Sequence, residues 1–119
     1  MKKVLVAGAG GFIGWHLVSK LLKKKYKVIC ADIKPLNKWF QVFKKTKNYS
    51  LDLKSYSNCL KITKNIDYVF NLACNMGGMG FIENNKADCM TSVLINTNLL
   101  RASNKRNIKK YLFSSSACL

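Results

Sequence analysis

A glycine-rich turn between an apolar run and a helical stripe restricts the fold of this chain more than any other feature. The run Val4–Ala7 is apolar, which is typical of a strand buried on both faces of a sheet. Four glycines follow it, at Gly8, Gly10, Gly11 and Gly14. Glycine permits a tight turn and a close approach of backbone segments. The order predicts a strand, a turn and a helix in immediate succession.

The helix after the turn is predicted to be amphipathic and to run from Phe12 to about Lys24. Ile13, Leu17 and Leu21 fall on one apolar stripe, and the lysines of the segment lie mostly away from it. Cations near its end are favourable, because the C-terminus of a helix carries partial negative charge.

The rest of the chain alternates between strand and helix patterns. Further strands are predicted over 27–31, 48–51, 68–72 and 110–113, and helices over 57–64 and 88–104 with Ser55 as an N-cap. Residues 36–45 fit either a short helix or a packed loop, and 76–80 form a glycine-rich loop. This order predicts one α/β domain over residues 1–119, with a doubly wound parallel sheet of about five strands.

The turn has the residues that a dinucleotide-binding Rossmann fold needs. Gly8 permits the tight turn, Gly11 leaves room for a pyrophosphate at the helix N-terminus, and Gly14 lets the helix pack closely against the strand. Asp32, at the end of the next strand, is placed to accept hydrogen bonds from ribose hydroxyls. A turn without any ligand is the alternative interpretation.

Two further polar residues leave the details of that site open. Asp32 would repel the 2′-phosphate of NADP and so favours NAD, whereas the nearby Lys34 keeps NADP open. Asp52, just after the third strand, either caps a helix or accepts a hydrogen bond from the adenine amino group.

The net charge of +16 would attract any polyanion, but its composition does not favour nucleic-acid recognition. Arg101 and Arg106 are the only arginines, and arginine is the residue that phosphate and base recognition prefers. No groove-reading motif accompanies the charge. Nucleic-acid binding is therefore the weakest functional interpretation.

The cysteines and the apolar runs indicate a reduced, cytoplasmic protein. The number of cysteines is odd and no C-x-x-C motif occurs, so neither a disulfide framework nor a metal site is expected. They are better explained as reduced thiols that are mostly buried. The five cysteines are Cys30, Cys59, Cys74, Cys89 and Cys118. No apolar run reaches the ~18 residues of a membrane span.

Two later segments add to the glycine turn and Asp32. Asn71–Ala73 follows a predicted strand, and Ser114–Ser116 ends the last one. Together these features resemble the extended short-chain dehydrogenase/reductases. Within them, Asn71–Ile82 with its run M-G-G-M-G-F-I, and Ser115–Cys118, resemble the GDP-mannose 3,5-epimerase family. The resemblance covers essentially the whole chain, but only the first part of such an enzyme.

The resemblance implies an NAD-dependent epimerase acting on a nucleotide sugar, a GDP-hexose. Such enzymes oxidise the sugar at C4, exchange the protons at C3 and C5, and then reduce C4 again. Cys118 matches the acid/base cysteine and Ser116 the active-site serine, and Gly77, Ser116, Ala117 and Cys118 match substrate contacts. The positions that match NAD contacts are Gly8, Gly10, Gly11, Phe12, Ile13, Gly14, Asp32, Asp52, Leu72 and Ala73.

The match departs from the family pattern in one important respect. No Tyr-x-x-x-Lys pair occurs in the chain, and the family's second acid/base, a lysine, and its substrate domain are also missing. We therefore expect an incomplete dinucleotide-binding domain that has no epimerase turnover alone. Trp15, Cys74 and Asn75 replace the usual residues, so Trp15 either crowds the cofactor or packs outward.

Several alternatives stay open at this point. Other extended family members, such as a UDP-sugar 4-epimerase or a nucleotide-sugar dehydratase, share the glycine turn and the serine-rich strand end. A module that binds NAD without catalysis also fits. The resemblance further implies a homodimer of the full-length enzyme, formed through helices that include 88–104. His16, the only histidine, is expected to pack or hydrogen-bond locally.

Overall fold

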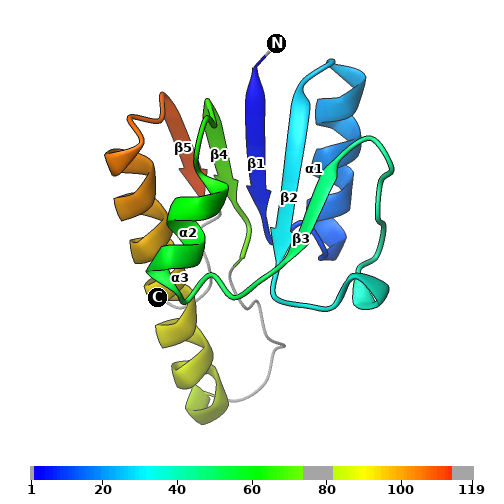
Figure 1. The fold of residues 1–119 in the computed structure, drawn as a ribbon. Helices are drawn as coiled ribbons and strands as arrows, with labels where there is room; N and C mark the ends of the chain where they lie inside the picture. Colours follow the sequence, from blue (N-terminus) through cyan, green and yellow to red (C-terminus); the bar gives the residue numbers. More distant parts are fainter. Residues whose placement is uncertain (1, 74–81, 114–119) are drawn as a thin grey trace.

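The computed structural model describes residues 2–73 and 82–113 as a three-layer α/β fold (Figure 1). All pairings in its single sheet are parallel, in the order β3-β2-β1-β4-β5. Helix α1 covers one face, and α2 and α3 cover the other. The elements are β1 (Lys3–Ala7), α1 (Phe12–Lys23), β2 (Lys27–Asp32), the short 3-10 helix η1 (Leu36–Lys38), β3 (Lys47–Ser50), α2 (Tyr56–Ile62), β4 (Tyr68–Asn71), α3 (Ile82–Lys105) and β5 (Lys110–Phe113). The doubly wound parallel sheet predicted from the sequence is confirmed.

The predicted element boundaries hold to within a residue or two, with one exception. Helix α3 begins at Ile82, six residues before the predicted start at Asp88. The first turns of α3 read E-N-N-K-A-D, which contains no apolar stripe and so gave no helical period. Ser55 is the N-cap of α2, as predicted, because its Oγ accepts a hydrogen bond from the N–H of Asn58 at 3.4 Å.

The segment over 36–45, which the sequence left open, is a short 3-10 turn followed by a loop. Only Leu36–Lys38 is helical, and Trp39 directly after it is buried. The Trp39 side chain packs with the residues under α1. The buried Trp39, together with the partly buried Phe43, therefore anchors a connection that has little regular structure.

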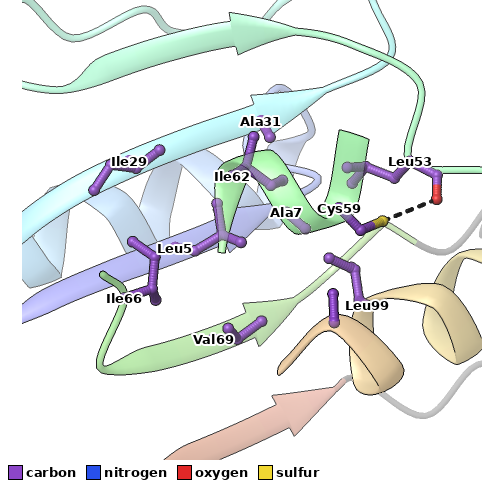
Figure 2. Packing of buried hydrophobic residues seen from close by; sticks show 11 residues of the cluster. Leu5, Ala7, Ile29, Ala31, Leu53, Cys59, Ile62, Ile66, Val69 and Leu99 are labelled. Atoms are coloured by element: carbon purple, nitrogen blue, oxygen red, sulfur yellow. Dashed lines mark hydrogen bonds between the residues drawn. The ribbon is translucent and has the colours of Figure 1, made fainter. Parts of the chain in front are cut away.

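The face of the sheet below α2 and α3 forms one core (Figure 2). Leu5 of the central strand lies beside Ile29 of β2 and Val69 of β4 in the strand register. All three point toward the helices, where Leu99 of α3 and Cys59 of α2 are fully buried. This core joins the two helices to the sheet.

The opposite face packs against α1. Val4 and Val6 alternate with Leu5 along β1, so they point to the other side of the sheet. There they meet Val18 and Leu21 of α1. Strand β1 is therefore buried on both faces, which explains why its sequence is apolar without alternation.

The thiols of Cys30 and Cys59 are free and buried, one in each core. Burial raises the pKa of each thiol to about 11, so both stay protonated near neutral pH. The Cys59 Sγ donates a hydrogen bond to the carbonyl of Leu53 at 3.3 Å (Figure 2). The predicted burial is confirmed for these two thiols. Cys74 and Cys118, and the side chain of Cys89, lie outside the described part of the chain.

Each helix is followed by a residue in the left-handed backbone region. Lys25, Asn65 and Asn107, with φ of 66°, 61° and 57°, come after α1, α2 and α3. A left-handed residue just past a helix end turns the chain away.

None of the helices within 2–73 and 82–113 is long and apolar enough to cross a membrane.

The fully buried Leu99 should contribute much of the stability of the α3 core. We expect Leu99→Ala to lower the free energy of unfolding by about 2–5 kcal/mol, since it removes buried methyl groups and leaves a cavity. Leu36→Ala, at a side chain that is 40% exposed, is the control and should change it by about 0.5 kcal/mol or less. Urea unfolding measures both, and equal losses would contradict this description of the core.

Candidate functional site

The first glycine of the turn lies at a point where only glycine fits. Gly8 has a φ of +84°, in the left-handed region that L side chains rarely adopt. A Cβ added there would also lie 2.5 Å from the carbonyl carbon of Leu72, just after β4. The N–H groups of Gly8 and Ala9 both donate to the carbonyl oxygen of Ala31, at 2.7 and 3.2 Å. The turn is thereby joined to the ends of both neighbouring strands.

Gly14 lets α1 pack directly on the turn. A Cβ on Gly14 would lie 2.5 Å from the carbonyl oxygen of Gly8 and 2.8 Å from the Cα of Ala9. The predicted role in close packing is therefore supported, although the partner is the turn itself rather than the strand before it. Gly8 and Gly14 are thus both required by the fold.

Gly11 differs from them because the fold itself does not require a glycine there. It is the N-cap of α1, with φ −85° and ψ 175°, an extended conformation open to any residue. An added Cβ would meet only the Gly8 carbonyl oxygen, at 3.6 Å. Space therefore remains open beside the first turn of α1.

Backbone donors point into that space. The first N–H groups of a helix have no intrahelical partner, and the first such bond here is from Trp15 to the carbonyl of Gly11. No side chain caps this end, and its first turn contains no acidic residue. Phe12 and Ile13 direct their side chains outward, with 57% and 59% exposed. The helix end therefore offers N–H groups and positive potential to an anion.

Asp32 lies next to the same turn. Its Oδ2 accepts a hydrogen bond from the N–H of Gly10 at 2.9 Å, and its Oδ1 accepts one from the N–H of Lys34 at 3.0 Å. These two bonds fix the carboxylate at the end of β2, with 7% of the residue exposed. The remaining lone pairs of the two oxygens can accept hydrogen bonds from hydroxyl groups.

Asp52 follows β3 at the same edge of the sheet. Its Oδ1 accepts a hydrogen bond from the N–H of Lys54 at 2.9 Å, and 44% of its side chain is exposed. Asn58 donates to its carbonyl at 2.9 Å, and Asn98 of α3 donates to the Lys54 carbonyl at 2.8 Å. Ser55 rather than Asp52 is the helix cap, and the half-exposed Asp52 carboxylate pairs with the Lys54 Nζ at 3.9 Å.

A buried polar network holds the end of β4. Asn71 is 4% exposed, and its Oδ1 accepts a hydrogen bond from the N–H of Ala73 at 3.0 Å. Its Nδ2 donates to the Asn96 Oδ1 at 3.2 Å and to the Tyr111 hydroxyl at 3.1 Å. The Tyr111 hydroxyl donates to the same Asn96 oxygen at 2.6 Å, and burial raises the pKa of Tyr111 to about 12.

This network fixes the residues that approach the turn. Leu72 and Ala73, which the sequence assigned to the cofactor, lie against Gly8. The sequence analysis did not identify Asn96 and Tyr111 as members of this network. The sequence contains no signal for this pairing, because Asn71, Asn96 and Tyr111 lie on three segments that are far apart in the chain.

The aromatic residues of α1 pack on one another. The Trp15 and His16 rings stack, with centroids 3.8 Å apart, and the Phe12 ring meets His16 edge-on at 4.8 Å. Phe12 also meets Phe40 at 5.6 Å. His16 packs locally, as predicted, and the Trp15 ring is directed along the helix toward it.

The structure brings together part of the predicted site. The glycine turn, Asp32, Leu72 and Ala73 meet, and Asp52 follows at the same sheet edge. Within the described residues, no group of three or more His, Cys, Asp or Glu side chains is placed to hold a metal ion. The predicted substrate and catalytic residues, Gly77, Ser116, Ala117 and Cys118, lie outside the described residues.

Comparisons with known proteins agree with this geometry. Residues 4–119 match the sequence model of the NAD dependent epimerase/dehydratase family. The chain is 37% identical over 118 residues to the GDP-mannose 3,5-epimerase of Arabidopsis thaliana, covering 98% of this chain and 31% of that enzyme.

Two solved structures are similar over nearly the whole chain. MoeE5 in complex with UDP-glucose and NAD superposes with a TM-score of 0.81 and 29% identity, over 97% of this chain and 36% of that one. The UDP-glucose 4-epimerase of Thermotoga maritima, determined with UDP-glucose, gives 0.77 and 25%, over 95% and 37%. The chain thus spans 31–37% of the length of these relatives. It belongs to the NAD dependent epimerase/dehydratase family.

Proposed function

We propose that this chain binds NAD and forms the N-terminal, cofactor-binding part of a nucleotide-sugar epimerase. The observation that carries the proposal is the open space at Gly11, beside the unpaired N–H groups of α1, in a turn whose neighbouring Gly10 binds the Asp32 carboxylate. A glycine that the backbone does not need, beside unused donors, is explained by a ligand that must come close.

Three parts of the cofactor, the pyrophosphate, the adenosine ribose and the adenine, have a matching group in the chain. The N–H groups of Phe12 and Ile13 would hold the pyrophosphate, and Asp32 would accept the adenosine ribose hydroxyls. Asp52, with its exposed carboxylate, would accept a hydrogen bond from the adenine amino group. Leu72 and Ala73, held in place by Asn71, would contact the cofactor where it passes the end of β4. When bound, NAD takes a hydride from the sugar and returns it.

The substrate and the catalytic residues belong to the same proposal. The likeness of segments 71–82 and 115–118 to GDP-mannose 3,5-epimerases supports a GDP-hexose as substrate. Cys118 would move a proton at the sugar ring, and Ser116 would hydrogen-bond the reacting oxygen, with Gly77 and Ala117 in contact with the sugar. Reduced thiols at Cys30 and Cys59 support a cytoplasmic location.

A UDP-sugar 4-epimerase is the second candidate. The solved structures that superpose on this chain include the Thermotoga maritima UDP-glucose 4-epimerase. The methionine- and glycine-rich run that follows Asn75 favours the GDP-hexose reading. A turnover assay on a chain completed by a substrate domain, with GDP-mannose and UDP-glucose in parallel, separates the two.

Gly11→Asp tests the binding site without disturbing the fold. Aspartate is a better N-cap than glycine and suits the helix dipole, so the melting temperature should stay equal or rise. Its carboxylate would occupy the pyrophosphate volume and repel it, so we expect the NAD affinity to fall by a factor of ~100 or more. Calorimetric titration with NAD measures the affinity.

Gly14→Ala is the matched comparison for stability and, unlike Gly11→Asp, should destabilise the protein. Its methyl group would press on the Gly8 carbonyl oxygen, so the protein should lose about 1–3 kcal/mol of stability through overpacking. If Gly11→Asp keeps both its stability and its full NAD affinity, NAD does not bind at this turn and the proposal is wrong.

We expect no epimerase turnover from this chain alone. It contains no Tyr-x-x-x-Lys pair to take the proton from the sugar C4 hydroxyl. In deuterated water with GDP-mannose and NAD, NMR should show no deuterium at C3 or C5, whereas a complete GDP-mannose 3,5-epimerase run in parallel should exchange both. Deuterium in the sample with this chain would contradict the expectation.

A homodimer through α3 is a further part of the proposal. The helix exposes an apolar stripe formed by Met90, Val93, Leu94 and Leu100, with exposed fractions of 74%, 62%, 45% and 49%. The stripe lies opposite the face that carries Leu99 into the core. Such a surface is typical of a contact between subunits.

A charge introduced into that stripe tests the contact. Sedimentation equilibrium should detect a dimer for the unchanged chain and a monomer for Leu94→Glu, because a buried unpaired carboxylate is costly. Val42→Glu, which alters an exposed valine of the β2–β3 connection, is the control and should remain a dimer. A monomeric unchanged chain would exclude this interface.

A further inference from the structure

The connection after β2 folds back onto the glycine turn. It carries η1 past the start of α1 (Figure 1). The N–H of Phe40 donates to the Gly10 carbonyl at 3.1 Å. Trp39 donates from Nε1 to the Lys34 carbonyl at 2.9 Å, and the Ser50 hydroxyl donates to the same oxygen at 3.0 Å. These bonds hold the Trp39 ring in one place.

That place is directly beside the Asp32 carboxylate. A Cβ added to Gly10 would lie 2.8 Å from both Cγ and Cδ1 of Trp39 and 2.9 Å from the Asp32 Oδ2. The indole and the carboxylate therefore both come within 3 Å of one point next to the turn. Trp39 is 8% exposed and Asp32 is 7% exposed, so little open volume is left around this carboxylate.

The available space has consequences for which dinucleotide fits. NAD presents a 2′-hydroxyl on its adenosine ribose, which needs only an acceptor lone pair. NADP presents a 2′-phosphate there, which needs volume and a cation. No arginine occurs anywhere before Arg101. Lys34 is exposed, and its backbone N–H and carbonyl are both taken by the bonds to Asp32 and Trp39.

We propose that Trp39 is a specificity-determining residue whose indole fills the volume that a 2′-phosphate would need beside Asp32. The inference rests on the proposed binding of NAD at this turn. The charge of Asp32 opposes the phosphate, and Trp39 adds a steric barrier that removing that charge would not remove. The indole is fixed by the Lys34 carbonyl, so it cannot turn aside without losing a partly buried hydrogen bond.

The test compares NAD and NADP affinities by calorimetric titration of the full 119-residue chain. The unchanged protein should bind NAD and reject NADP. In Trp39→Ala and Trp39→Leu, the ratio of the NADP to the NAD dissociation constant should fall by a factor of ~10 or more, equivalent to about 1.4 kcal/mol. Trp15→Leu is the matched control, because Trp15 packs on His16 instead, and it should leave the ratio unchanged.

A packing role for Trp39 makes a different prediction. Trp39 belongs to the core under α1, so its variants will lose stability in either case. A purely structural residue would weaken both dinucleotides equally and leave the ratio of their affinities unchanged. An unchanged ratio in Trp39→Leu, with a native circular dichroism spectrum, would therefore overturn the proposal. Equal binding of NAD and NADP by the unchanged chain would overturn it too, while leaving the proposed binding of NAD intact.

A second measurement needs no change at Trp39. In Trp15→Phe, Trp39 is the only remaining tryptophan, so its fluorescence reports on the volume beside Asp32. NAD should shift the emission, and NADP at the same concentration should not. A calorimetric NAD signal without any fluorescence change would contradict the placement of Trp39, and the absence of any calorimetric signal from the unchanged chain would overturn the proposed function together with this inference.

Discussion

The backbone of the glycine turn touches backbone on both of its sides, with no side chain between. Gly8 meets the residues that follow β4, and Gly14 brings α1 onto Gly8 itself. Such contacts allow little adjustment, because backbone atoms have no alternative rotamers. The N-terminus of α1 is therefore held at a fixed place relative to the middle of the sheet. The other parts of the site are arranged around that point.

Polar side chains at the same edge of the sheet serve mainly to hold backbone. Asn71 holds the chain after β4, Asn98 holds the chain after β3, and Asp32 holds the turn after β1. The bonds of Asn98 and Asp32 connect elements that are far apart in the sequence, whereas the bond from Ala73 to Asn71 is local. In a chain with a net charge of +16, the carboxylates of Asp32 and Asp52 still lie at this edge, where the adenosine of the proposed NAD complex would present hydroxyl and amino donors.

The fold could be predicted almost completely, because its signals are local. Val4–Ala7, the glycines and the stripe of α1 each indicate their structure within a few residues. The site could be predicted only where a single residue suffices, as at Gly8 and Asp32. The position of Trp39 against Gly10, and the bond from Tyr111 to Asn96, depend on how distant segments meet. No local period or propensity contains that information.

The glycines of the turn are under different kinds of constraint, and this affects how the segment can evolve. Gly8 and Gly14 are required for folding, so any descendant that folds in this way must keep them. Gly11 is tolerant of side chains as far as the backbone is concerned, so in the proposed NAD complex only the ligand would require a glycine there. A lineage that lost its cofactor would be free to substitute Gly11 first, and comparison of that position among descendants would date the loss.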